Sequence, residues 1–135
     1  MRLPHCVALA LCLALGAAPA LSQDSPGESD ARAVALANAV LDRMEAGEFE
    51  AATADFNAQM RAGLGPRQLA DVQRQIEATG PVRERGEPHV LHHDGFTVVV
   101  FRIEREQAAL EATVAIDGEG RIGGLHFVPA NGNPR

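Results

Sequence analysis

The chain changes its hydrophobic period once, at Thr79-Gly80-Pro81, and this change constrains the fold more than any other feature. Before it, apolar residues recur at helical spacing. After it, they alternate as they do in β-strands. A run of helices followed by a run of strands is typical of α+β domains, in which helices cover one face of an antiparallel sheet. We therefore expect three N-terminal helices packed on one face of a four-stranded antiparallel meander.

Three amphipathic stripes precede the change. Asp30 is expected to cap the first helix and Gly47 to end it, because these residue types suit the two helix ends. A second helix is expected to begin near Phe49 and to end at Gly63, and a third to begin at Pro66. The apolar stripes are, in order, Val34, Ala37, Leu41 and Met44; Phe49, Ala52, Phe56 and Met60; and Leu69, Val72 and Ile76.

Four strands are expected after Pro81, over residues 82–91, 96–105, 107–116 and 121–128. Pro88 cannot donate a ladder hydrogen bond, which confines the first strand to an edge. Alternation predicts an inner face made of Val99, Phe101, Ile103, Leu110, Ala112, Val114, Ile116, Leu125 and Phe127. The opposite face, which carries Val98, Val100, Arg102, Thr113, Ala115, Ile122 and His126, is more apolar than a solvated sheet face needs to be.

The first 22 residues have the three parts of a secretory signal peptide. Arg2 lies in a short n-region, Cys6–Ala18 is apolar but too short to span a bilayer, and Ala18-Pro19-Ala20 fits a cleavage site. We expect export to the periplasm or the extracellular space, without membrane insertion after cleavage. Residues 23–29 are expected to be a flexible linker, residues 30–130 one domain, and residues 131–135 a loose tail.

Composition narrows the function. From Asp30 onward the chain has no Ser, Cys, Lys, Tyr or Trp, which removes most side chains used for covalent catalysis. The net charge of −6 at pH 7 argues against binding to nucleic acid, which requires a basic surface.

Four segments together resemble a known family: EAGEFE at Glu45–Glu50, LGPRQLADVQRQIEATGPV at Leu64–Val82, TVVVFRIE at Thr97–Glu104 and DGEGRIGGLHFVPA at Asp117–Ala130. The pattern resembles the secreted bacterial family called domain of unknown function 3887, which is similar to the nuclear-transport-factor-2-like and cystatin-like cone folds. The resemblance covers Asp30–Ala130 and implies export and a cone-shaped α+β fold. In that family the domain often stands alone or precedes a hydrolase domain, which implies an accessory role beside an envelope hydrolase.

Cone folds often hold a pocket between the helices and the sheet, and some relatives use it for enolisation with an Asp base and a Tyr-containing oxyanion hole. This chain has no Tyr, which leaves Asp55 and Glu77 as candidate general bases. The alternative is that both are surface carboxylates. The pocket would be lined by Phe49, Phe56 and Phe101 and would suit a small apolar ligand. If these three residues fill it instead, an enzyme has no site.

Histidines and arginines are the remaining candidates for binding. His92 and His93 are adjacent and point to opposite faces of their strand, so we expect no metal site and no cofactor. The histidines considered are His89, His92, His93 and His126. The arginines Arg83, Arg85, Arg102 and Arg105 either pair with glutamates across neighbouring strands or include an anion-binding pair.

The preferred hypothesis is a non-catalytic module that binds a ligand or forms a homodimer. The dimer would bury the second apolar sheet face, with Val98, Val100, Ile122 and His126 in the interface. The alternatives are a small pocket enzyme that uses carboxylate acid/base chemistry, and an accessory partner of an envelope hydrolase.

Overall fold

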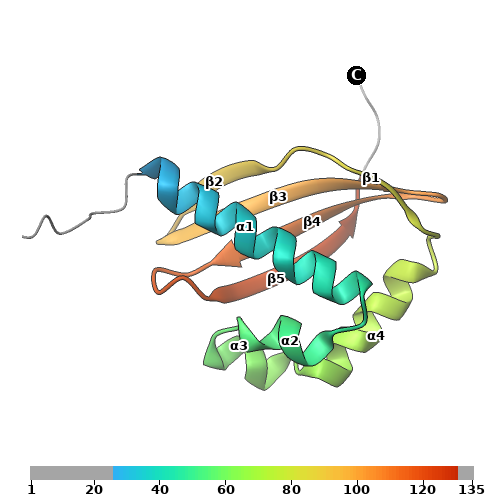
Figure 1. The fold of residues 1–135 in the computed structure, drawn as a ribbon, viewed down its shortest axis with the longest axis horizontal. Helices are drawn as coiled ribbons and strands as arrows, with labels where there is room; N and C mark the ends of the chain where they lie inside the picture. Colours follow the sequence, from blue (N-terminus) through green and yellow to red (C-terminus); the bar gives the residue numbers. More distant parts are fainter. Residues whose placement is uncertain (1–25, 131–135) are drawn as a thin grey trace, which may run out of the picture.

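The computed structural model describes residues 26–130, which form four helices and one five-stranded antiparallel sheet. The α+β class is therefore confirmed. Helix α1 runs across one face of the sheet, and α2, α3 and α4 gather beside β5 (Figure 1). The elements are α1 (Pro26–Glu45), α2 (Phe49–Ala54), α3 (Ala58–Gly63), α4 (Pro66–Glu77), β1 (Val82–Arg85), β2 (His89–His93), β3 (Phe96–Arg105), β4 (Ala109–Ile116) and β5 (Ile122–Pro129). The predicted signal peptide, residues 1–22, and the predicted tail, residues 131–135, lie outside the described residues.

Helix α1 begins earlier than predicted. Residues 26–29 belong to the helix and not to a linker, and Asp30 is not the cap. Proline suits a first helical position because its missing N–H would have no partner there. Glu28 in the first turn adds a favourable charge at the helix N-terminus. The Asp30 carboxylate instead lies 2.8 Å from Nε2 of His92 in β2.

The predicted second helix is interrupted at Phe56, which gives α2 and α3 in place of one helix. Phe56 forms an isolated parallel bridge with Ile122 at the start of β5. The Ile122 N–H donates to the Asp55 carbonyl, and the Asn57 N–H donates to the Ile122 carbonyl, both at 2.9 Å. Asn57 then caps α3, because its Oδ1 accepts from the Met60 N–H at 2.8 Å. The tertiary bridge therefore overrides the helical spacing of Phe56.

The predicted strand over residues 82–91 is divided into β1 and β2, which pair with different halves of the same edge of β3. Gly86 still donates its N–H to the Arg102 carbonyl at 2.8 Å. Pro88 has no N–H with which to continue the ladder, so the strand is interrupted before it. The strand order across the sheet is β1-β3-β4-β5. β2 also pairs with β3, along the same edge as β1.

The predicted inner face is confirmed. Val99, Phe101 and Ile103 of β3 are buried in one apolar core with α1, Leu69 of α4 and Phe56. The alternate residues of β4 belong to the same core, namely Leu110, Ala112, Val114 and Ile116. Leu125 and Phe127 of β5 pack against it and are half-buried.

The prediction that Ile122 lies on the opposite face is wrong, because Ile122 is fully buried in the core. The register of β4 and β5 shifts so that Ala115 faces Gly124 while Ile116 faces Ile122. Gly123 is thus an extra residue in β5, and such a bulge reverses the alternation of side chains. A Cβ atom on Gly123 would lie 2.9 Å from Cε1 of Phe96, so a larger residue at the bulge would require the Phe96 side chain to shift.

Candidate functional site

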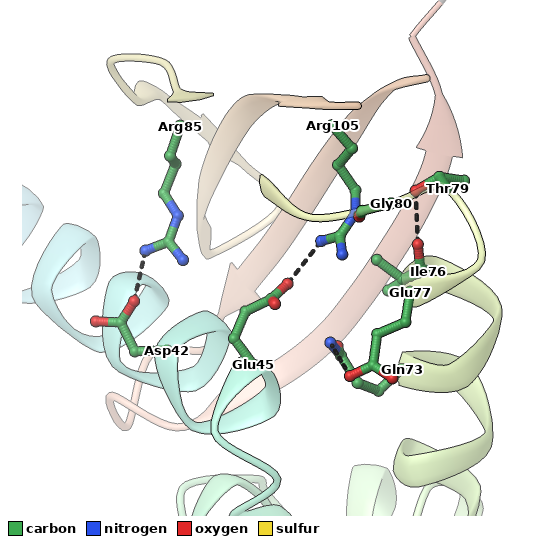
Figure 2. Close-up of polar contacts among 9 residues, drawn as sticks. All are labelled: Asp42, Glu45, Gln73, Ile76, Glu77, Thr79, Gly80, Arg85 and Arg105. Carbon is green, nitrogen blue, oxygen red and sulfur yellow. Dashed lines mark hydrogen bonds and ion pairs between the residues drawn. The ribbon is translucent and has the colours of Figure 1, made fainter. Parts of the chain in front are cut away.

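Two arginines on the inner face of the sheet point toward the C-terminal half of α1. Arg105 ends β3, and Arg85 ends β1 opposite Ile103. Figure 2 shows them reaching toward Glu45 and Asp42 of α1, with Gln73 and Glu77 of α4 nearby. The cluster therefore lies where α1, α4 and the sheet meet.

Arg105 is locked in place. Its side chain is 2% exposed, and Nη1 donates to Oε1 of Glu45 at 2.7 Å. Its Nε donates to the Gly80 carbonyl at 2.7 Å. Gly80 has a φ of 90°, and a Cβ atom there would lie 2.7 Å from Cβ of Glu106, so only glycine fits without a shift. Arg105 thus ties α1 and the α4–β1 junction to β3.

Arg85 is held differently. Its Nη1 donates to Oδ1 of Asp42 at 2.8 Å and to Oδ1 of Asn38 at 3.1 Å. Its guanidinium carbon lies 6.0 Å from the centre of the Phe101 ring, at the limit of a cation–π contact. Among the described residues, Nε of Arg85 is the buried side-chain polar atom that has no hydrogen-bond partner. Leaving such a donor unpaired costs about 1–3 kcal/mol.

The two arginines line a small chamber of about 10 Å³ between the helices and the sheet. Outside it lies a groove of about 720 Å³ between the end of α1, α2 and α4. Glu45 and Gln73 line both spaces and so form the wall between them. Gln73 is 2% exposed, and its Nε2 donates to Oε1 of Glu77 at 3.2 Å. The chamber and the groove are therefore adjacent, and Glu45 and Gln73 are common to both.

The two candidate general bases lie apart. Asp55 follows the last residue of α2 and pairs with Nη1 of Arg43 at 2.5 Å, with about a third of its side chain exposed. Glu77 is exposed at the end of α4, on the rim of the groove. Neither carboxylate is desolvated at the base of the chamber, which is the setting that raises carboxyl basicity for general-base catalysis.

The prediction that three phenylalanines line a pocket is wrong for two of them. Phe56 and Phe101 are 0% and 1% exposed and fill the core. Phe49 is half-buried and lines the groove. The interior space is therefore small because aromatic rings occupy it.

The outer face, which is the side of the sheet away from α1, carries the large exposed hydrophobic side chains of the described residues. These are Leu91, Phe96 and Val128, at 57%, 36% and 47% exposure. Leu91 faces Val98 across β2 and β3, and Val98 faces Ala115 across β3 and β4. Val100 lies in the next row, with His89 beside it on β2 and His126 two strands away on β5. Val98, Val100 and His126 are thus on the face predicted for them.

Asp117 organises the turn between β4 and β5. Its Oδ1 accepts from the N–H groups of Arg121 and Glu119, both at 3.0 Å, and its Oδ2 accepts from Nδ2 of Asn57 at 3.1 Å. These bonds, that of Arg121 first, hold the pKa of Asp117 below its ordinary value of 3.8 although partial burial opposes the shift. The carboxylate therefore joins the turn to the link between α2 and α3.

Within residues 26–130, no group of three His, Cys, Asp or Glu side chains gathers as a metal site would require. His92 points toward α1 and Asp30, whereas His126 is exposed on the outer face. No helix of the same range is long and apolar enough to cross a membrane.

The chain was compared with protein-family models, with curated proteins and with solved structures, and none of them matches it.

Proposed function

We propose that this chain is an exported, non-catalytic assembly module that forms a homodimer through the outer face of its sheet. The observation that carries the proposal is the position of Leu91, Phe96 and Val128, which all project from that face. Val98 and Val100 are half-buried and continue the apolar surface beside Leu91 and Phe96, whereas Val128 lies on β5 in the row of Arg102 and Glu111. Contiguous apolar patches of this kind mark interaction sites in soluble proteins.

The size of the outer face suits a dimer. Four strands spaced about 4.8 Å apart, with a rise of about 3.3 Å per residue, offer roughly 500 Å² per copy over the length of β4 and β5. Two copies packed face to face then bury about 1,000 Å², the lower limit of a specific interface. This arrangement is the aligned packing of two sheets, in which the outer-face side chains of one copy interdigitate with those of the other.

Charges on the outer face favour a second copy as the occupant. Arg102 and Glu111 face each other across β3 and β4, so both signs lie at one end of the face. A two-fold axis places the same patch on both sides of the interface. A two-fold axis near this end of the face would bring each copy's arginine, which pairs with Glu104 in its own chain, toward a glutamate of the other copy.

Export is supported by the signal-peptide pattern of residues 1–22 and by the resemblance to the secreted family. That family also suggests an envelope hydrolase as the partner. The two occupants differ in a simple way, because a hydrolase partner leaves the purified chain monomeric.

Sedimentation velocity of the purified protein at micromolar concentration tests the proposal, and we expect a dimer. Leu91→Glu places like charges in the interface and should give a monomer that is folded and unfolds cooperatively, because Leu91 is 57% exposed in one copy. Val98→Glu, in the same row, should act in the same direction. Ala35→Glu, on the exposed side of α1, is the matched control and should remain dimeric. A monomeric wild-type protein would overturn the proposal.

A further inference from the structure

Arg85 has a hydrogen-bond donor that no group in residues 26–130 accepts. Its Nε is buried and unpaired, while Nη1 of the same guanidinium is engaged by Asp42 and Asn38. Buried polar groups in native proteins are paired with protein, water or ligand, so an exception requires an explanation. Arg85 lines the chamber, and about 10 Å³ is room for one water molecule and nothing larger.

The wall of the chamber is a side chain that can move. Gln73 is held toward Glu77, which is itself exposed to solvent on the groove rim. Water competes for a hydrogen bond to an exposed carboxylate, so the bond between Gln73 and Glu77 holds the Gln73 side chain only weakly. If the Gln73 side chain turns outward, the chamber and the groove become one cleft with Arg85 and Arg105 at its base.

We propose that this cleft binds a small organic carboxylate, which enters from the groove and receives a hydrogen bond from Nε of Arg85. The planar fork of an arginine matches a carboxylate and accounts for the choice of head group. Arg105 is already bonded to Glu45 and Gly80, so its charge is paired and Arg85 makes the direct contact.

The groove defines the rest of the ligand. Phe49, Ala46 and Ala70 give it an apolar wall, and its volume of about 720 Å³ accommodates a small molecule. The ligand therefore has a compact aromatic or branched aliphatic body in addition to its carboxylate. This differs from the purely apolar ligand expected from the sequence. The cleft lies on the opposite side of the sheet from the outer face, so the inference does not depend on the homodimer.

Benzoate is a suitable probe, with benzamide as the neutral control of the same shape. Arginine Nε–Hε resonances of ¹⁵N-labelled protein report directly on the unpaired donor. We expect a saturable shift of the Arg85 Nε–Hε resonance with benzoate and no comparable shift with benzamide. Arg85→Lys, which removes that resonance, also assigns it.

Three variants sharpen the test. Arg85→Lys keeps the charge but loses the fork, and should weaken benzoate binding about tenfold or more. Gln73→Ala removes the Gln73 part of the wall and should tighten benzoate binding about threefold or more, because closure by this side chain no longer competes with the ligand. Arg83→Lys changes an exposed arginine of the same strand and should have no effect. Thermal unfolding of each variant shows whether it is folded, and Gln73→Ala carries the test if Arg85→Lys is not.

Three results would overturn the proposal. The first is no saturable shift with benzoate, and the second is an equal response to benzamide. The third is a lasting contact between the Arg85 Nε–Hε proton and one water molecule that benzoate does not displace, because the chamber would then hold water alone.

Discussion

Val100 and Phe101 are neighbours in β3, and their side chains lie on opposite faces of the sheet. Phe101 is 1% exposed beneath α1, whereas Val100 is half-buried on the outer face. The charged residues differ in the same way. Arg105 on the inner face is 2% exposed and needs the partners that it has, while Arg102 on the outer face is half exposed beside Glu104. Side chains on the inner face therefore need close packing and ion-pair partners for stability, whereas those on the outer face can be solvated instead.

The largest expected effect compares Phe101→Ala with Val100→Ala. Loss of the buried ring should lower the free energy of unfolding by about 3–5 kcal/mol, since the core closes only partly around the space. Loss of two half-exposed methyl groups should cost about 1 kcal/mol. Urea denaturation at a protein concentration low enough to populate the monomer measures both. Equal losses would mean that the two faces are not distinguished by burial.

A second comparison concerns the two ion pairs. Glu45→Gln leaves Arg105 buried without a countercharge and should cost about 2–3 kcal/mol, below the value for a fully buried pair because Glu45 is 37% exposed. Glu104→Gln removes the partner of Arg102 on the outer face and should cost less than about 0.5 kcal/mol. Chemical denaturation at neutral pH reads both. If Glu104→Gln loses as much stability as Glu45→Gln, the two faces do not differ in their need for ion pairs.

The smallest effect on stability is expected at Asp117, in the turn between β4 and β5. The pKa of Asp117 is lowered in the folded protein, so the unfolded chain takes up the proton first as the pH falls. Its stabilising contribution is complete well above the ordinary value of 3.8 and is lost as the pH falls from there through the folded-state pKa. Asp117→Asn keeps an oxygen acceptor for the turn and should flatten the fall in stability on the acid side.

Urea denaturation between about pH 3 and about pH 7 measures how the free energy of unfolding changes with pH. This range covers the titration of Asp and Glu side chains, at about pH 3–5, and the region just above it. Glu119→Gln, an exposed residue of the same turn, is the control and should leave the slope unchanged. An unchanged slope in Asp117→Asn would show that the hydrogen bonds of the turn do not favour the charged carboxylate.

Strong local patterns made part of the fold predictable. The bounds of β3 are those expected, because β-branched and aromatic residues follow one another without a break from Phe96 to Phe101. Phe56 and Ile122 were misplaced for different reasons. Phe56 is held by its bridge to Ile122, a contact between distant segments that no local pattern shows, and Ile122 changes face at the Gly123 bulge. Asn57 and Gly123 do carry local signals, a helix cap and a bulge, but many turns and loops contain the same residue types.

The candidate site was partly visible as well. Arg85 and Arg105 were identified as possible members of an anion-binding pair, and Arg105 shares its parity with Ile103 on β3. What could not be predicted is their burial, which depends on where Asp42 and Glu45 of α1 lie above the sheet. Glu77 lies on the groove rim, although not as a buried base. The role of Gln73 as a wall depends on the packing of α4 and has no signal in the sequence.

The bridge between Asp55, Asn57 and Ile122 also bears on local opening of the fold. One residue of β5 holds the link between α2 and α3 by two backbone bonds, one in each direction. The link cannot leave the edge of the sheet unless Ile122 loses both bonds, and the start of β5 cannot fray while they persist. Detachment of the small helices and fraying of the last strand are therefore a single cooperative event, and hydrogen exchange at the Asn57 and Ile122 amides should follow one opening equilibrium.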